Sequence, residues 1–158
     1  MTITRHFTAT GFVIHSNRML IHWHSKVGAW LPPGGHINEN EDPVQAVLRE
    51  INEETGVIAE VVPTGPALDL TYPSQIHSPF AIMLEDIQDP VNGYHQHIDL
   101  IYFCRILDSS QPINHGWYWI HKKQLLSNDP VRYQGGESVC APEDVRQLAL
   151  QAFEVIKD

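Results

Sequence analysis

The chain has 158 residues, an apolar fraction of 42% and a formal net charge of −9, from 19 acidic residues against 10 lysines and arginines. This length suits one domain with a hydrophobic core, and we expect residues 1–158 to form it. The excess of acid disfavours binding to nucleic acid polymers and to membranes through basic patches. It would also repel a polyphosphate substrate unless metal ions neutralise that substrate.

Signals for export and for cysteine chemistry are weak in this sequence. The N-terminal segment Met1–Phe7 lacks the long apolar core of a signal peptide, and no apolar run approaches the length of a membrane span. The two cysteines, Cys104 and Cys140, show neither metal-binding nor redox spacing. We therefore expect a cytoplasmic protein with no membrane contact, in which both cysteines are reduced core thiols.

The remaining elements follow from hydrophobic pattern and turn residues. Strands are predicted at residues 7–15, 19–24, 57–62, 80–87, 95–107 and 117–120. Ser16 and Asn17 predict a turn between the first two strands, and residues 64–79 and 128–141 are predicted as loops. A helical turn is predicted at 122–126 and a helix at 142–157. This pattern predicts an α/β sandwich with a mixed central sheet between helices.

The clearest single element is a helix from Pro43 to Thr55. Asp42 is the expected N-cap, Pro43 fits the first helical position, and Gln45 completes an Asp-x-x-Gln capping box. Gly56 lies where a left-handed residue would end the helix. At roughly 100° per residue, the apolar side chains of this segment form one stripe that should face the core.

Three carboxylates lie on a different face of this helix. Glu50 is separated from Glu53 and Glu54 by three and four residues, and each like-charge pair destabilises a helix by roughly 0.2–0.5 kcal/mol. Glu53 and Glu54 also lie in the last turn, where the helix dipole favours cations. A solvated charged face is the simpler explanation, but several acidic residues at positions that destabilise one helix favour a functional site. Mg²⁺ or Mn²⁺ would make these oxygens ligands.

The segment before the helix supports a functional site. Two prolines and two glycines follow Trp30 and Leu31, and His36 closes the segment. Glycines allow a backbone to approach a ligand closely and to offer it carbonyl or amide groups. Because this loop leads directly into the helix, we expect its backbone to lie near the three carboxylates.

Together these residues resemble the signature of the Nudix (MutT-like) hydrolases. The match covers every specified position over 23 residues: Gly35, Glu41, Arg49, Glu50, Ile51, Glu53, Glu54, Gly56 and Val57. The resemblance implies the α/β/α Nudix fold and a Mg²⁺- or Mn²⁺-dependent pyrophosphohydrolase that cleaves a nucleoside diphosphate linked to another group. It implies a small-molecule nucleotide or pyrophosphate as the substrate, and it admits a homodimer.

The resemblance also implies roles for single residues. The metal ligands or proton acceptors would be Glu50, Glu53 and Glu54. Gly35 would offer its backbone carbonyl to the metal, Arg49 would orient a glutamate through a salt bridge, and Glu41 would brace the loop against the helix. A glutamate not fully engaged by metal would accept a proton from the attacking water, and we favour Glu50 or Glu54 for this role.

Two other functions remain open. A Nudix-fold sensor would bind a nucleotide without hydrolysis, but a pure binder has no need to keep all of the acids. An isomerase of isoprenoid diphosphate shares the fold, and it would use a catalytic cysteine in the pocket. Cys104 lies in the middle of a predicted strand, which makes it a poor candidate for that role.

Several residues outside the signature are candidates for contact with substrate. Trp30, Tyr72 and Tyr133 could stack on a base, although packing is the simpler explanation for each aromatic side chain. Glu137 follows two glycines in a predicted loop, and with Glu85 and Asp99 it is a candidate for a further carboxylate ligand. The motif does not encode which pyrophosphate is the substrate.

Two histidines and an aspartate form a further polar group on one predicted strand. His95, His97 and Asp99 alternate along a predicted strand and should share one face. This pattern is typical of a polar sheet face, and the functional alternatives are a substrate-contacting rim or an accessory metal site. The candidate substrate-binding residues are Trp30, Tyr72, His97 and Glu137.

Overall fold

The computed structural model describes residues 3–157; Met1 and Thr2, which begin the N-terminal segment considered above, and Asp158 lie outside the described part. Its strands are β1 (Arg5–His15), β2 (Arg18–His24), β3 (Ala29–Leu31), β4 (Gly34–His36), β5 (Ala59–Val61), β6 (Ala81–Asp89), β7 (Gly93–Ile106), β8 (Trp117–His121), β9 (Val131–Arg132) and β10 (Ser138–Val139). Its helices are α1 (Pro43–Thr55), α2 (Lys122–Leu126) and α3 (Glu143–Val155).

Strands β1 to β8 form one mixed sheet, whose central path is β3-β2-β1-β7-β5. The two long central strands, β1 and β7, run parallel, and the other pairs are antiparallel. β4 pairs with β1, β6 with β7 and β8 with β2, while β9 and β10 form a separate two-stranded sheet. The mixed sheet expected from the sequence is therefore confirmed.

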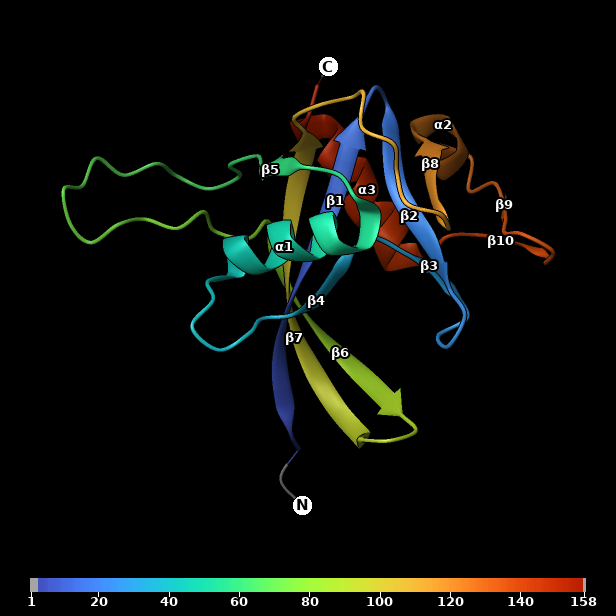
Figure 1. Ribbon diagram of the computed structural model, residues 1–158, viewed down its shortest axis with the longest axis horizontal. Helices are drawn as coiled ribbons and strands as arrows, with labels where there is room; N and C mark the ends of the chain where they lie inside the picture. Colours follow the sequence, from blue (N-terminus) through green and yellow to red (C-terminus); the bar gives the residue numbers. More distant parts are fainter. Residues whose placement is uncertain (1–2, 158) are drawn as a thin grey trace.

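A helix covers each face of the sheet, and each covered face has its own hydrophobic cluster (Figure 1). On one face, Val47 and Ile51 of α1 pack with Val13 of β1. On the other face, Ala149 and Phe153 belong to the cluster that α3 forms with the sheet. The architecture is the α/β/α sandwich that the sequence predicted. The β6–β7 hairpin and the start of β1 extend beyond the helices (Figure 1).

The structure confirms the helix bounds predicted for α1 and the turn at Ser16-Asn17, whose φ angles of 48° and 56° suit a tight hairpin. The segments predicted as loops are partly wrong. Residues 128–141 contain β9 and β10, and residues 30–36 contain the end of β3 and all of β4. These strands are two or three residues long, and each depends on a partner strand rather than on its own pattern.

The cysteines differ in environment. Cys104 is fully buried in β7, and burial raises the pKa of its thiol, which confirms it as a core residue. Cys140 is half-buried and its thiol donates a hydrogen bond to the carbonyl of Asn128 at 3.2 Å, so the expectation of a core position was wrong for it. Within residues 3–157, no helix combines the length and the hydrophobicity needed to cross a bilayer.

His22 couples the stability of the sheet to pH. Its ring stacks on Trp117 with ring centroids 4.3 Å apart. Burial lowers the pKa of His22 to about 4, and repulsion by His24 adds to this effect. Because the unfolded chain takes up this proton near pH 6.5, the contribution to stability is complete above that pH and is lost as pH falls toward 4.

We therefore expect His22→Phe, which keeps an aromatic ring on Trp117, to lose less stability than the parent chain between pH 7.5 and pH 5. The difference should be roughly 1 kcal/mol after discounting for solvent screening. Urea unfolding at the two pH values measures it. His115→Gln, in an exposed loop, is the matched control and should follow the parent chain. Identical pH profiles for His22→Phe and the parent chain would contradict the assignment.

Candidate active site

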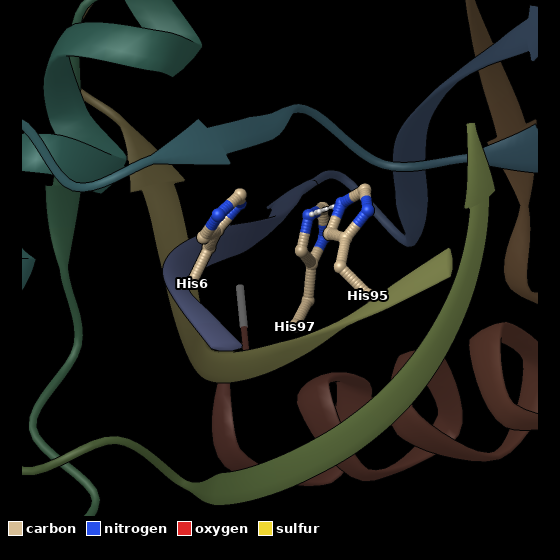
Figure 2. A group of neighbouring side chains, drawn as sticks. All are labelled: His6, His95 and His97. Atoms are coloured by element: carbon tan, nitrogen blue, oxygen red, sulfur yellow. Dashed lines mark hydrogen bonds between the residues drawn. The ribbon is translucent and has the colours of Figure 1, made fainter. Parts of the chain in front are cut away.

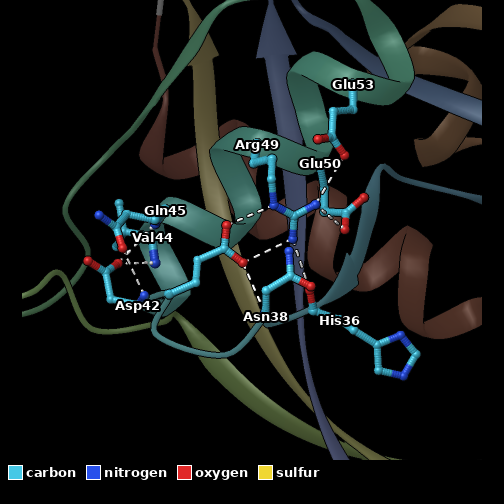
Figure 3. Close-up of polar contacts among 9 residues, drawn as sticks. His36, Asn38, Asp42, Val44, Gln45, Arg49, Glu50 and Glu53 are labelled. Carbon is cyan, nitrogen blue, oxygen red and sulfur yellow. Dashed lines mark hydrogen bonds and ion pairs between the residues drawn. The ribbon is translucent and has the colours of Figure 1, made fainter.

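Strand pairing fixes the position of β4, and a capping box fixes the start of α1. β4 pairs antiparallel with β1, which places Gly35 opposite Ala9. The Asp42 side chain accepts hydrogen bonds from the amides of Val44 and Gln45 at 2.8 and 2.9 Å, and the side-chain oxygen of Gln45 accepts one from the amide of Asp42 at 2.9 Å (Figure 3). The capping box predicted from the sequence is thereby confirmed.

Arg49 is the centre of the polar contacts between the loop and the helix (Figure 3). Its Nε and Nη2 atoms donate to the two carboxylate oxygens of Glu41 at 2.7 and 3.0 Å, a bidentate ion pair. Hydrogen bonding to Arg49 lowers the pKa of Glu41. Nη2 also donates to the backbone carbonyl of His36 at 3.0 Å. One guanidinium thus joins the end of β4, the loop and α1.

The same guanidinium contacts two of the three signature carboxylates. Nη1 of Arg49 donates to Glu50 at 2.7 Å and to Glu53 at 3.1 Å. The Glu50 side chain is 16% exposed, whereas that of Glu53 is 60% exposed. Glu50 therefore lies against the protein, and Glu53 reaches solvent.

Glu54 faces β4 instead. Its carboxylate accepts a hydrogen bond from the backbone amide of Gly34 at 3.1 Å. Burial raises the pKa of Glu54 to about 7, the Gly34 amide opposes that rise, and the charges of Glu50 and Glu53 add to it. The negative form of this carboxylate is thus costly in the absence of a nearby cation.

Gly35 provides a close approach between strand and helix. A Cβ atom at this position would lie 2.5 Å from Oε1 of Glu50 and 2.6 Å from its Cδ, so only glycine leaves the carboxylate where it is. The backbone of β4 and the carboxylates of α1 therefore line the same space. All of these donors are oxygens, which suits Mg²⁺ or Mn²⁺ better than a metal that prefers nitrogen or sulfur.

The structure places the other candidate residues elsewhere. Trp30 has no exposed surface, belongs to the core, and donates through Nε1 to the carbonyl of Val131 at 3.3 Å, so packing rather than base stacking accounts for it. Tyr133 stacks on Trp23 with centroids 4.2 Å apart. Tyr72 is 87% exposed in the long loop between β5 and β6. Glu137 is exposed in the turn between β9 and β10, and these two strands lie away from α1 in Figure 1.

Asp99 and Glu85 lie on the face that α3 covers, opposite the signature carboxylates. Asp99 is buried and accepts hydrogen bonds from the hydroxyls of Thr8 at 2.9 Å and Thr10 at 2.7 Å. Glu85 is paired in register with His97, and its raised pKa of about 7 comes from burial and from the charges of Asp99 and Asp144. The sequence did not indicate the two threonine partners.

The chain is similar to known proteins of one family. A family model described as the NUDIX domain matches residues 4–134. Nudix hydrolase 25 of Arabidopsis thaliana is 52% identical over 40 residues, 25% of this chain and 23% of that protein. The RNA pyrophosphohydrolase of Zymomonas mobilis is 29% identical over 112 residues, 63% of this chain and 66% of that protein. This chain thus spans less than two thirds of the length of either relative.

Among solved structures, a NUDIX-family hydrolase from Clostridium perfringens is similar with a TM-score of 0.74 and 24% sequence identity. The alignment covers 98% of this chain and 100% of that one. At this identity the likeness concerns the fold, and it extends over the whole sandwich, including both covering helices.

Proposed function

Because this chain belongs to the Nudix family, we propose that it is a Mg²⁺- or Mn²⁺-dependent pyrophosphohydrolase that cleaves a nucleoside diphosphate linked to another group. Members of this family generally use divalent metal ions. The observation that carries the proposal is a cluster of three carboxylates beside β4. Glu50 and Glu54 lie against the backbone of β4, and Arg49 joins Glu50 to Glu53. The name of the Zymomonas relative, an RNA pyrophosphohydrolase, supports a pyrophosphate bond as the target.

Each residue of the site has a distinct proposed task. A bound divalent ion would polarise the phosphorus centre and lower the pKa of the attacking water. Glu50, Glu53 and Glu54, with the carbonyl of Gly35, would hold that ion. Glu54 or Glu50 would accept the proton of the water, and both carboxylates face the backbone of β4. Arg49 would position Glu50 through their 2.7 Å contact.

Charge supports a role for cations in this reaction. The chain carries a formal net charge of −9, and three of its carboxylates lie together where a polyphosphate would have to bind. Without neutralisation, the substrate and the site repel each other. A divalent ion held by these carboxylates would remove this repulsion.

A substrate panel tests the proposal. Nucleoside triphosphates, dinucleoside polyphosphates, nucleotide sugars and ADP-ribose are incubated with the protein and Mg²⁺ or Mn²⁺, and the phosphate-containing products are separated. We expect at least one compound to be split at its pyrophosphate bond, and EDTA to stop the reaction. Tight binding of a panel compound without any cleavage would contradict hydrolysis and would favour a nucleotide sensor.

A further inference from the structure

Four histidines from three strands converge on the face of the sheet opposite α1. Parallel pairing of β1 with β7 aligns His6 with His97, and His95 is two residues away on the same face of β7. The antiparallel pairing of β4 with β1 sets His36 opposite Thr8, next to His6 along the same face. Figure 2 shows the rings of His95 and His97 with a nitrogen of each facing the other, and the ring of His6 to one side of them.

The nitrogen atoms of this histidine cluster (His6, His36, His95 and His97) have the spacing of metal ligands. Nε2 of His95 and Nε2 of His97 are 3.2 Å apart, and Nε2 of His36 and Nδ1 of His6 are 3.3 Å apart. With Zn–N bonds of about 2.0–2.1 Å, two ligands of a tetrahedral ion are separated by about 3.3–3.4 Å. Ligand atoms of His6, His95 and His97 all lie within 4.8 Å of one another, so side-chain rotations that move these nitrogens by up to about 1.5 Å bring them to that separation.

The hydrogen bonding and burial of the rings suit a ligand role. Nδ1 of His95 lies 3.1 Å from the carbonyl of Gly93 and donates to it, which leaves the lone pair of Nε2 free to face His97. Metal-binding histidines are commonly oriented by such a contact through the other ring nitrogen. His95 is only 5% exposed. Burial, together with the neighbouring imidazoles, also lowers the pKa of His97 to about 4, so its ring is neutral near pH 7.

Two further side chains with oxygen atoms lie near the cluster. Glu85 is paired in register with His97, and Asp99 follows His97 on the same face of β7. Among residues 3–157, His6, His95 and His97 are the one group of three histidine, cysteine or acidic side chains whose ligand atoms all lie within 4.8 Å of one another. Four imidazole rings thus form a nitrogen-rich site, and the carboxyl groups of Glu85 and Asp99 follow on the same face of the sheet.

We propose that His6, His36, His95 and His97 bind one divalent transition-metal ion of the class that imidazole prefers, such as Zn²⁺, Co²⁺ or Ni²⁺. Its donors are imidazole nitrogens, whereas the carboxylates of α1 offer oxygens and suit Mg²⁺ or Mn²⁺. The bound ion joins β1, β4 and β7 beyond the ends of the covering helices. It also fixes His36, whose carbonyl accepts from Arg49, and so holds the end of β4 beside the candidate active site.

Metal binding to the full chain, prepared without a histidine tag, tests the proposal. Calorimetry with ZnCl₂ in the presence of excess Mg²⁺ should give one Zn²⁺ per chain, and Co²⁺ should give the visible absorption of a tetrahedral complex. His95→Gln/His97→Gln is expected to weaken Zn²⁺ binding by at least about 100-fold and to abolish the Co²⁺ spectrum. His77→Gln/His115→Gln removes two exposed loop imidazoles and should bind as the parent chain does.

Several results would overturn the proposal. One is the absence of Zn²⁺ uptake by the parent chain, and another is equal uptake by His95→Gln/His97→Gln. A third is Zn²⁺ binding that disappears only when Glu53 and Glu54 are replaced, since the ion then belongs to the carboxylates. If the double variant does not fold, the single change His36→Gln at an exposed position replaces it, with the same expected loss of the Co²⁺ spectrum. An unchanged spectrum in His36→Gln would then exclude a four-histidine site.

Discussion

Glu54→Gln is expected to lower metal-dependent pyrophosphate hydrolysis by at least about 100-fold, within the range of 10²–10⁴ typical of a lost general base. Glutamine has the same shape, and its side-chain carbonyl can still accept the 3.1 Å hydrogen bond from the amide of Gly34. The change therefore removes the negative charge without removing the contact between α1 and β4. Turnover of the substrate found in the panel, at saturating Mg²⁺, measures the effect.

Stability separates this effect from misfolding. Glu54 and Glu50 are four residues apart on α1, so neutralising Glu54 relieves a repulsion of roughly 0.2–0.5 kcal/mol, and the melting temperature should stay level or rise. Glu60→Gln is the matched control, because Glu60 forms an exposed ion pair with Arg105 at 2.6 Å on β5 and should keep full activity. Activity of Glu54→Gln equal to that of Glu60→Gln would refute the role of Glu54.

Gly35→Ala should also reduce activity strongly, by roughly 100-fold, while the fold remains intact. The added Cβ would lie 2.5 Å from Oε1 of Glu50, so that carboxylate must move away and lose its contact with Arg49. A displacement of about 1 Å at a catalytic group can cost about 10²-fold in rate. The clash involves the far end of a flexible side chain, which can give way, so the melting temperature should change little.

Gly11→Ala provides the opposite control beneath the same helix. Its Cβ would lie 2.7 Å from Cδ1 of Ile51 and 2.9 Å from Cγ2 of Val47, both in the core. Overpacking of this kind costs typically 1–3 kcal/mol, so Gly11→Ala should lower the melting temperature and leave kcat of the folded protein unchanged. Full activity of Gly35→Ala would contradict a role for this close approach, and so would a variant whose only defect is the loss of stability expected of Gly11→Ala.

The sequence predicted the bounds of α1 accurately because their determinants are local. Asp42, Gln45 and Gly56 are cap signals within or beside the helix, and the face of each carboxylate follows from helical periodicity. The long strands β1 and β7 were also predicted, with bounds within two residues, because each is a continuous β-rich run.

Residues that depend on distant partners were not predictable in the same way. Trp30 is adjacent to the glycine-rich segment, yet its indole hydrogen-bonds to Val131, 101 residues further along the chain. The alternation of His95 and His97 was visible in the sequence. Their meeting with His6 and His36 required the registers of β1 with β7 and of β4 with β1. One sequence does not contain strand order, and so half of the histidine cluster was missed.

Titration of Mn²⁺ followed by electron paramagnetic resonance tests the central claim most directly. In the parent chain and in His95→Gln/His97→Gln, added Mn²⁺ should be taken up, with the free-ion signal suppressed until the site is filled. In Glu53→Gln/Glu54→Gln the uptake should be lost, because two of the proposed oxygen ligands have lost their charge. Equal Mn²⁺ uptake by the glutamine variant and the parent chain would contradict a metal site on α1.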